Sequence, residues 1–408
     1  MNRWLKWLLP VPLIIASGLA WQIWRDSHPL AFSLGAPLLE TKVRPQILSG
    51  GKVAVLLAPD GTLWVWGEDK SLPNGRTAIP VRLGDASDWI DIAGSWDFML
   101  ARKADGSMWS WKPHGAIPNL HAGLTAFAPQ RIGTDTDWRF IATTGFDGGW
   151  AIRRSGSVWA WGRYDNDTGF DPMPAQFGNE PDAAAIGADI VSRYVLRRDG
   201  SIWSRDPRHA SDGTIKMQQT QLSSERDWAA ISAHHQLLAL KTDGSVWVGG
   251  GAASFNAVPE GSSLATAPFK QLGEDRDWTE IRDSSNCCFA RKRDGSWWAM
   301  GENLDGRLGF APYGRNWNIE LEKMPFTFDP WALGVGGTTT LMLARDGSLW
   351  SWGKKLGSPP PSAKSKGFRT FANRWVGQLP LRPKPFPDPG AVWDNRPHKI
   401  WQWKAETH

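Results

Sequence analysis

The chain has 408 residues, a formal net charge of +5, 28 tryptophans and two cysteines. The cysteines, Cys287 and Cys288, are adjacent, and neighbours in sequence do not easily reach ordinary disulfide geometry, so no disulfide framework is expected. Together with the tryptophans, 43 glycines and 29 prolines favour many short strands over long helices. The composition therefore predicts an all-β protein.

The first predicted element is a hydrophobic N-terminal helix within residues 1–30. Arg3 and Lys6 precede an apolar stretch over residues 7–24, which is typical of an export signal. The stretch is near the short limit for crossing a bilayer, and small residues near its end resemble a cleavage site. Two outcomes stay open. The segment is either a membrane anchor, with the body outside the inner membrane facing the periplasm or exterior, or a removed signal peptide that leaves a secreted protein.

A repeated unit follows, in which a turn dipeptide, usually Asp-Gly, is followed by Ser or Thr, a mostly aliphatic position and Trp. Asp-Gly suits a tight hairpin turn whose twist matches its flanking strands. Seven copies at intervals of 44 to 52 residues predict a seven-bladed β-propeller over residues 31–357. The copies centre on Asp60, Asp105, Ser155, Asp199, Asp243, Asp294 and Asp346, each followed by glycine.

A second marker, usually Asp-Trp, precedes six of the turns by 16 to 18 residues and begins a further strand. A fourth strand is expected in the variable stretch after each Trp-rich strand, which completes a four-stranded blade. Because 17 of the 28 tryptophans occupy the two repeating positions, we predict that most of the indole rings fill space between blades.

The C-terminal segment, residues 358–408, is rich in proline and basic residues. Its prolines exclude a regular central strand. Apolar residues at 391–393 and 399–403 predict a hairpin that closes the ring by completing the first or the last blade.

The repeats resemble those of the regulator of chromosome condensation family. The best copies span residues 60–67, 155–162 and 346–353, and residues 301–309 match the family's Gly-x-Asn-x-x-Gly-x-Leu-Gly extension. The resemblance implies a seven-bladed propeller, here of an exported, bacterial type. The family's His before the Asp-Gly turn is absent, so binding chemistry does not carry over from it. Some relatives are exchange factors for a nuclear GTPase, which an exported chain would not meet.

No phosphate-binding loop, metal site or activated nucleophile is recognisable, so neither a cofactor nor an enzymatic activity is predicted. The main hypothesis is a non-enzymatic binding or scaffolding propeller with a protein partner outside the cytoplasm. Binding of carbohydrate or a cell-envelope polymer is the alternative, because exposed aromatic rings stack on sugars. A hydrolase on a propeller scaffold is a third reading. Nucleic acid is not an expected partner.

The candidate partner-binding residues lie in the variable loops between the Asp-Trp strand and the strand that enters the turn. The resemblance places a partner-binding face there, and aromatic side chains with polar neighbours suit interface hot spots. A local packing role is an open alternative for each of them. These residues are Trp96, Asp97, Phe146, Asp147, Tyr194, His234, His235 and Asn286.

Overall fold

The structure is a computed structural model. It describes residues 42–50, 52–68, 72, 75–94, 98–111, 129–144, 148–162, 171–189, 192–209, 215–234, 236–249, 269–284, 287–303, 306–309, 317–325, 328–336, 338–354, 356 and 393–404. The hydrophobic helix expected within residues 1–30 lies outside these ranges. None of the described segments forms a helix long and apolar enough to cross a membrane.

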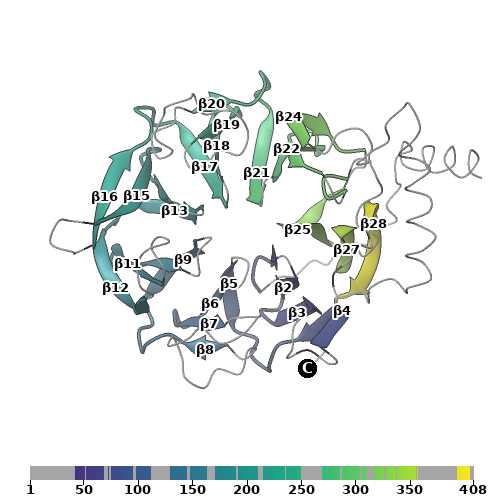
Figure 1. Cartoon of the computed structure of the whole chain (residues 1–408), viewed down its shortest axis with the longest axis horizontal. Helices are drawn as coiled ribbons and strands as arrows, with labels where there is room; N and C mark the ends of the chain where they lie inside the picture. Colours follow the sequence, from purple (N-terminus) through teal and green to yellow (C-terminus); the bar gives the residue numbers. More distant parts are fainter. Residues whose placement is uncertain are drawn as a thin grey trace, which may run out of the picture.

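The described residues form seven antiparallel four-stranded sheets arranged in a ring (Figure 1). This confirms the predicted seven-bladed β-propeller with a fourth strand in every blade. We call the blades A to G in chain order. In each, the first strand is nearest the central axis and the fourth is outermost.

The strands of the first four blades are as follows. Blade A has β1 (Gln46–Ser49), β2 (Val53–Leu57), β3 (Leu63–Glu68) and β4 (Arg76–Arg82), and blade B has β5 (Trp89–Gly94), β6 (Met99–Lys103), β7 (Met108–Trp111) and β8 (Gln130–Arg131). Blade C has β9 (Trp138–Thr143), β10 (Gly149–Arg153), β11 (Ser157–Gly162) and β12 (Asp171–Asn179), and blade D has β13 (Ala183–Ala188), β14 (Arg193–Arg197), β15 (Ile202–His209) and β16 (Ile215–Gln221).

The remaining three blades follow the same order. Blade E has β17 (Trp228–Ala233), β18 (Leu237–Lys241), β19 (Val246–Gly249) and β20 (Lys270–Gln271). Blade F has β21 (Trp278–Ser284), β22 (Cys287–Lys292), β23 (Trp297–Glu302) and β24 (Trp317–Lys323), and blade G has β25 (Pro330–Val335), β26 (Thr339–Ala344), β27 (Ser348–Lys354) and β28 (Trp393–Gln402).

Because the strands alternate in direction, each blade has two distinct ends. The turns between the second and third strands, together with the connections between blades, lie on one side of the ring, which we call the turn face. The connections between the first and second strands and between the third and fourth strands lie on the opposite side, the loop face. Strand β27 ends and β28 begins on the loop face, and residues 357–392 between them lie outside the described ranges.

Each repeated turn is held by the same set of hydrogen bonds. In blade E, Asp243 Oδ1 accepts from the backbone N–H of Ser245 at 2.9 Å and from its hydroxyl at 2.6 Å. The Trp247 indole N–H in turn donates to Ser245 Oγ at 2.8 Å. Equivalent bonds from the indole to the hydroxyl occur in all seven described blades, with Thr62 replacing serine in blade A. The repeat sequence thus encodes a turn and the orientation of a tryptophan together.

The Asp-Trp marker belongs to a second repeated contact. In blade B, Lys103 lies over the rings of Trp89 and Trp109, 4.8 and 5.0 Å from their centroids, and pairs with Asp88 at 2.9 Å. The two indoles meet edge to face at 81°. Blades C, E and F repeat this arrangement with Arg153, Lys241 and Lys292. Paired indoles around a cation combine aromatic and cation–π attraction.

The hydrophobic core is divided among the seams between blades. Each cluster of buried apolar residues in the described chain combines side chains from two neighbouring blades. Trp66, Trp111, Trp161, Trp297 and Trp352 are among the fully buried side chains of these seams. Their burial supports the prediction that the repeat tryptophans fill space between blades.

The ring is closed by packing between blades A and G, and not by a shared blade. Residues 393–402 form one strand, β28, which pairs with β27 and completes the last blade, so the expected hairpin is not formed. This places part of the C-terminal segment inside the propeller. The strand tolerates Pro397 because, as the outermost strand, it has no further neighbour that needs the missing N–H.

The closing seam is apolar. Trp66 and Leu56 of blade A share a buried cluster with Leu343 and Trp403 of blade G. At its edge, the Trp64 and Trp401 rings approach to 4.7 Å between centroids. Among the described residues, no covalent bond and no exchanged strand joins the two blades. The apolar seam between blades A and G therefore holds the ring closed.

We predict that Ser245→Ala lowers the free energy of unfolding by about 1–2 kcal/mol, because it leaves the Trp247 N–H and Asp243 Oδ1 short of partners. Ser245→Thr is the matched control, since Thr62 performs the same role in blade A. Chemical denaturation measures both. Equal losses in the two variants, or no loss in the alanine variant, would contradict the role of the hydroxyl.

We predict that Trp401→Ala lowers the free energy of unfolding by about 3 kcal/mol, because it opens the seam at Trp64. Lys399→Ala on the same strand is the control, since Lys399 is exposed and its loss is expected to change stability by less than about 0.5 kcal/mol. Equal denaturation midpoints for the two variants would show that the contact between Trp64 and Trp401 does not hold the ring closed.

Candidate functional site

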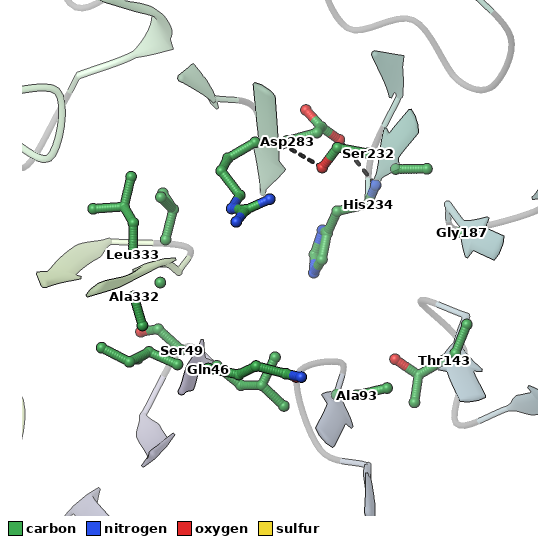
Figure 2. A pocket seen from close by; sticks show the side chains of 18 of the residues that line it. Gln46, Ser49, Ala93, Thr143, Gly187, Ser232, His234, Asp283, Ala332 and Leu333 are labelled. Carbon is green, nitrogen blue, oxygen red and sulfur yellow. Dashed lines mark hydrogen bonds between the residues drawn. The ribbon is translucent and has the colours of Figure 1, made fainter. Parts of the chain in front are cut away.

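The first strands of all seven blades surround a cavity of about 430 Å³ at the centre of the ring (Figure 2). A cavity of this size falls within the range of small-molecule sites, about 300–1,000 Å³. Its ionisable lining residues, among those described, are Arg44, His234, Arg282 and Asp283. The rest of the wall is small, apolar or neutral polar.

Strand pairing defines equivalent positions around this cavity. In each blade, one first-strand residue pairs with the second-strand residue five positions before the turn residue, and these first-strand residues form one ring. The first-strand residues whose partners lie six positions before the turn residue form the next ring. The first ring contains Leu48, Ala93, Ala142, Gly187, Ser232, Arg282 and Gly334. The second contains Ser49, Gly94, Thr143, Ala188, Ala233, Asp283 and Val335. In both rings, blade F alone supplies a charged side chain.

Arg282 is partly enclosed by the channel. Its guanidinium pairs with Glu280 at 2.7 Å, and 38% of its side chain remains exposed, toward the interior of the ring. Burial lowers the pKa of Arg282; Glu280 opposes that effect, whereas the like charge of Arg44 adds to it. An arginine stays protonated at neutral pH, so the wall of the channel carries a fixed positive group.

Asp283 links blades E and F at the loop face. Its Oδ2 accepts from the backbone N–H groups of His234 and Gln236 at 2.9 and 3.3 Å. Its own N–H donates to Ser232 Oγ at 2.8 Å. In Figure 2, the imidazole of His234 projects from this linked segment toward the cavity. The carboxylate therefore fixes the backbone that positions His234.

Blades A and B are linked in a similar way nearer the turn face. The Gln46 amide donates to Asp91 Oδ1 at 3.1 Å and accepts from the Ile92 N–H at 3.2 Å. Burial raises the pKa of Asp91, and Arg102 opposes that rise. These contacts hold the innermost strands in place, so the cavity wall is preorganised.

The adjacent cysteines are small buried residues on β22, as predicted. Burial raises the pKa of Cys287 to about 12 and that of Cys288 well above its ordinary value. Both thiols are protonated at neutral pH, which makes them poor nucleophiles. Within the described ranges, no group of three His, Cys, Asp or Glu side chains is placed to hold a metal ion.

Only two of the eight predicted partner-binding residues are described. His234 is half-buried at the cavity mouth. Tyr194 is fully buried in the seam between blades D and E, and its hydroxyl donates to Asp189 at 2.6 Å, so the ring serves packing and not an exposed surface. The other six lie outside the described residues. They are Trp96, Asp97, Phe146, Asp147, His235 and Asn286.

Arg282 was missed by the sequence analysis. The repeat does contain a signal for it, since the equivalent residues lie 11 to 13 positions before each turn residue and only blade F has a charge there. That signal becomes visible once strand pairing fixes the register.

No protein-family model matches the sequence, and no curated protein matches it. Solved structures do resemble the chain. Prp20p from Saccharomyces cerevisiae is 16% identical with a TM-score of 0.59, over 88% of this chain and 88% of that one. Its structure was reported with its binding to Gsp1p and histones.

Two further structures support the same likeness. Yeast RCC1 (Prp20) bound to Kap60 has a TM-score of 0.59 and 13% identity, over 91% of this chain and 89% of that one. Human WBSCR16 has a TM-score of 0.58 and 12% identity, over 84% and 94%. The chain has an RCC1-like propeller fold. At these identities the likeness extends to the fold alone.

We predict that Asp283→Ala increases hydrogen exchange at the His234 and Gln236 amides by roughly tenfold or more, because a charged acceptor is lost. Asp283→Asn keeps one oxygen acceptor and is expected to give a smaller increase. Exchange resolved by mass spectrometry or NMR measures this. Unchanged rates in the alanine variant would contradict the proposed link.

Proposed function

We propose that this RCC1-like propeller is a non-enzymatic binding or scaffolding protein that presents its loop face to a protein partner. The main support for the proposal is that the two faces of the ring differ in how far their sequence repeats. The repeated polar residues of the turn face hold turns and tryptophans in place. On the loop face, the described first and third strands end where the sequence stops repeating from blade to blade.

The known behaviour of structural neighbours supports a protein partner. Prp20p is described with Gsp1p and histones, and yeast RCC1 with Kap60. The sequence over residues 357–392, between β27 and β28, also contains six Lys or Arg residues against one Asp. We therefore expect the partner to present an acidic surface.

The proposed setting is outside the cytoplasm. It is supported by the apolar stretch over residues 7–24 with Arg3 and Lys6 before it, which suits either an inner-membrane anchor or a cleaved export signal. In this setting the partner is a periplasmic, extracellular or membrane protein.

We predict that Trp96→Ala with Phe146→Ala reduces capture of the partner from the source cells by roughly tenfold or more, as expected for interface hot spots. The matched control is Arg154→Ala with Thr242→Ala, two exposed residues of the turn face. Quantitative mass spectrometry of proteins retained by the tagged full chain measures the difference.

Equal loss in both double variants, or no protein retained by the wild-type chain, would contradict the proposal. Retention on envelope polysaccharide without a protein partner would instead favour carbohydrate binding. Circular dichroism of each variant establishes that it is folded before capture is compared.

A further inference from the structure

The outermost strand of each blade is the edge of its sheet, and six of the seven described edges have features that discourage pairing with another chain. Natural sheet edges are protected in this way by short strands, prolines, bulges and charged residues. Strands β8 and β20 contain two residues each. Strands β4, β12 and β28 contain proline, and β24 has a register shift in its pairing and three charged residues.

Strand β16, the edge of blade D on the outer rim of the ring, differs from these six (Figure 1). Its residues Ile215–Gln221 include no proline and a single charge, Lys216. It pairs with β15 over seven consecutive residues without a register shift, whereas the pairing of every other long outer strand contains one. Within the described part of the chain, no strand follows β16 in its sheet, and Gln218 and Gln219 are exposed. Blade D therefore ends in a regular, nearly neutral edge.

The sequence of β16 is compatible with pairing to a second β16. A regular edge strand can accept a further antiparallel strand through alternate backbone groups. When two copies are centred on Gln218, the fourth of the seven residues, all seven residues of each strand are paired. Lys216 then lies opposite Thr220, so no like charges face each other. Glutamine faces glutamine at the centre, and an amide both donates and accepts hydrogen bonds. The strand is thus complementary to a copy of itself.

We infer that β16 is a self-association surface, through which two copies of this chain form an antiparallel dimer with one sheet continuous across both D blades. Two-fold pairing uses the same edge in both copies, and the other six described edges are protected, so assembly stops at two chains. Seven residue pairs form a small interface, and the expected dimer is therefore weak and reversible. The surface is separate from the proposed loop-face surface and does not depend on another protein.

The first test is a disulfide bond between two copies of the full chain. In a pair centred on residue 218, Gln218→Cys places two thiols opposite each other, close to the separation that a disulfide needs. After mild oxidation we expect a crosslinked fraction roughly fivefold or more above that of Gln176→Cys, an exposed position on the outer strand β12. Cys287 and Cys288 are buried and should not contribute.

The second test places charge at the same position. Gln218→Lys sets two like charges opposite each other and should reduce co-capture of two differently tagged full chains by roughly fivefold. Mixing the Gln218→Lys chain with a Gln218→Glu chain should restore co-capture, because opposite charges then face each other. Gln176→Lys is the matched control and should have no effect. Circular dichroism of each variant establishes that it is folded.

The inference is overturned if two wild-type chains are not captured together, or if Gln218→Cys crosslinks no more than Gln176→Cys. It is also overturned if Gln218→Lys has no more effect than Gln176→Lys, or if the mixture of opposite charges does not restore co-capture. Because these measurements involve only copies of this chain, their failure would leave the proposed loop-face partner untouched.

Discussion

The hydrogen bonds that join each turn residue to a Ser or Thr and then to a Trp are the interaction on which the ring depends. They fix the positive-φ turn, the direction of the third strand and the orientation of an indole within one short segment. In blades B, C, E and F that indole then meets the Asp-Trp ring around a basic side chain. The hydrogen bonds of the turn therefore orient the indoles that pack within each of these blades.

The pattern changes in blades A and G, the first and last blades, which pack against each other. At the position of the basic residue, blades A and G have Ala58 and Ala344, both buried. Their seam is filled by apolar side chains, with Trp64 against Trp401. Blade D departs differently: it has Ala183 instead of the marker tryptophan, and the buried Glu180 pairs with Arg197 and Arg205. The fold thus tolerates loss of the cation or of one indole when another buried contact replaces it.

This repetition also separates the residues that the fold explains from those that it does not. Residues that recur in every blade are explained by turns, seams and rings of small side chains around the axis. Blade F breaks the small-residue rings with Arg282 and Asp283, one facing the cavity and the other fixing the segment that contains His234. A charge at this position in one blade of seven has no role in the repeat itself.

The sequence by itself determined the number of blades and the four strands in each, because an Asp-Gly turn with its following Ser and Trp is a local signal that recurs at a fixed period. It also correctly assigned the cysteines and most tryptophans to the interior. Only the tertiary structure decided that residues 393–402 form one outer strand of the last blade, that Tyr194 is buried in a seam, and that Arg282 faces the axis. These features depend on the pairing of strands and the contact of blades that are distant in sequence, and no local pattern specifies such a register.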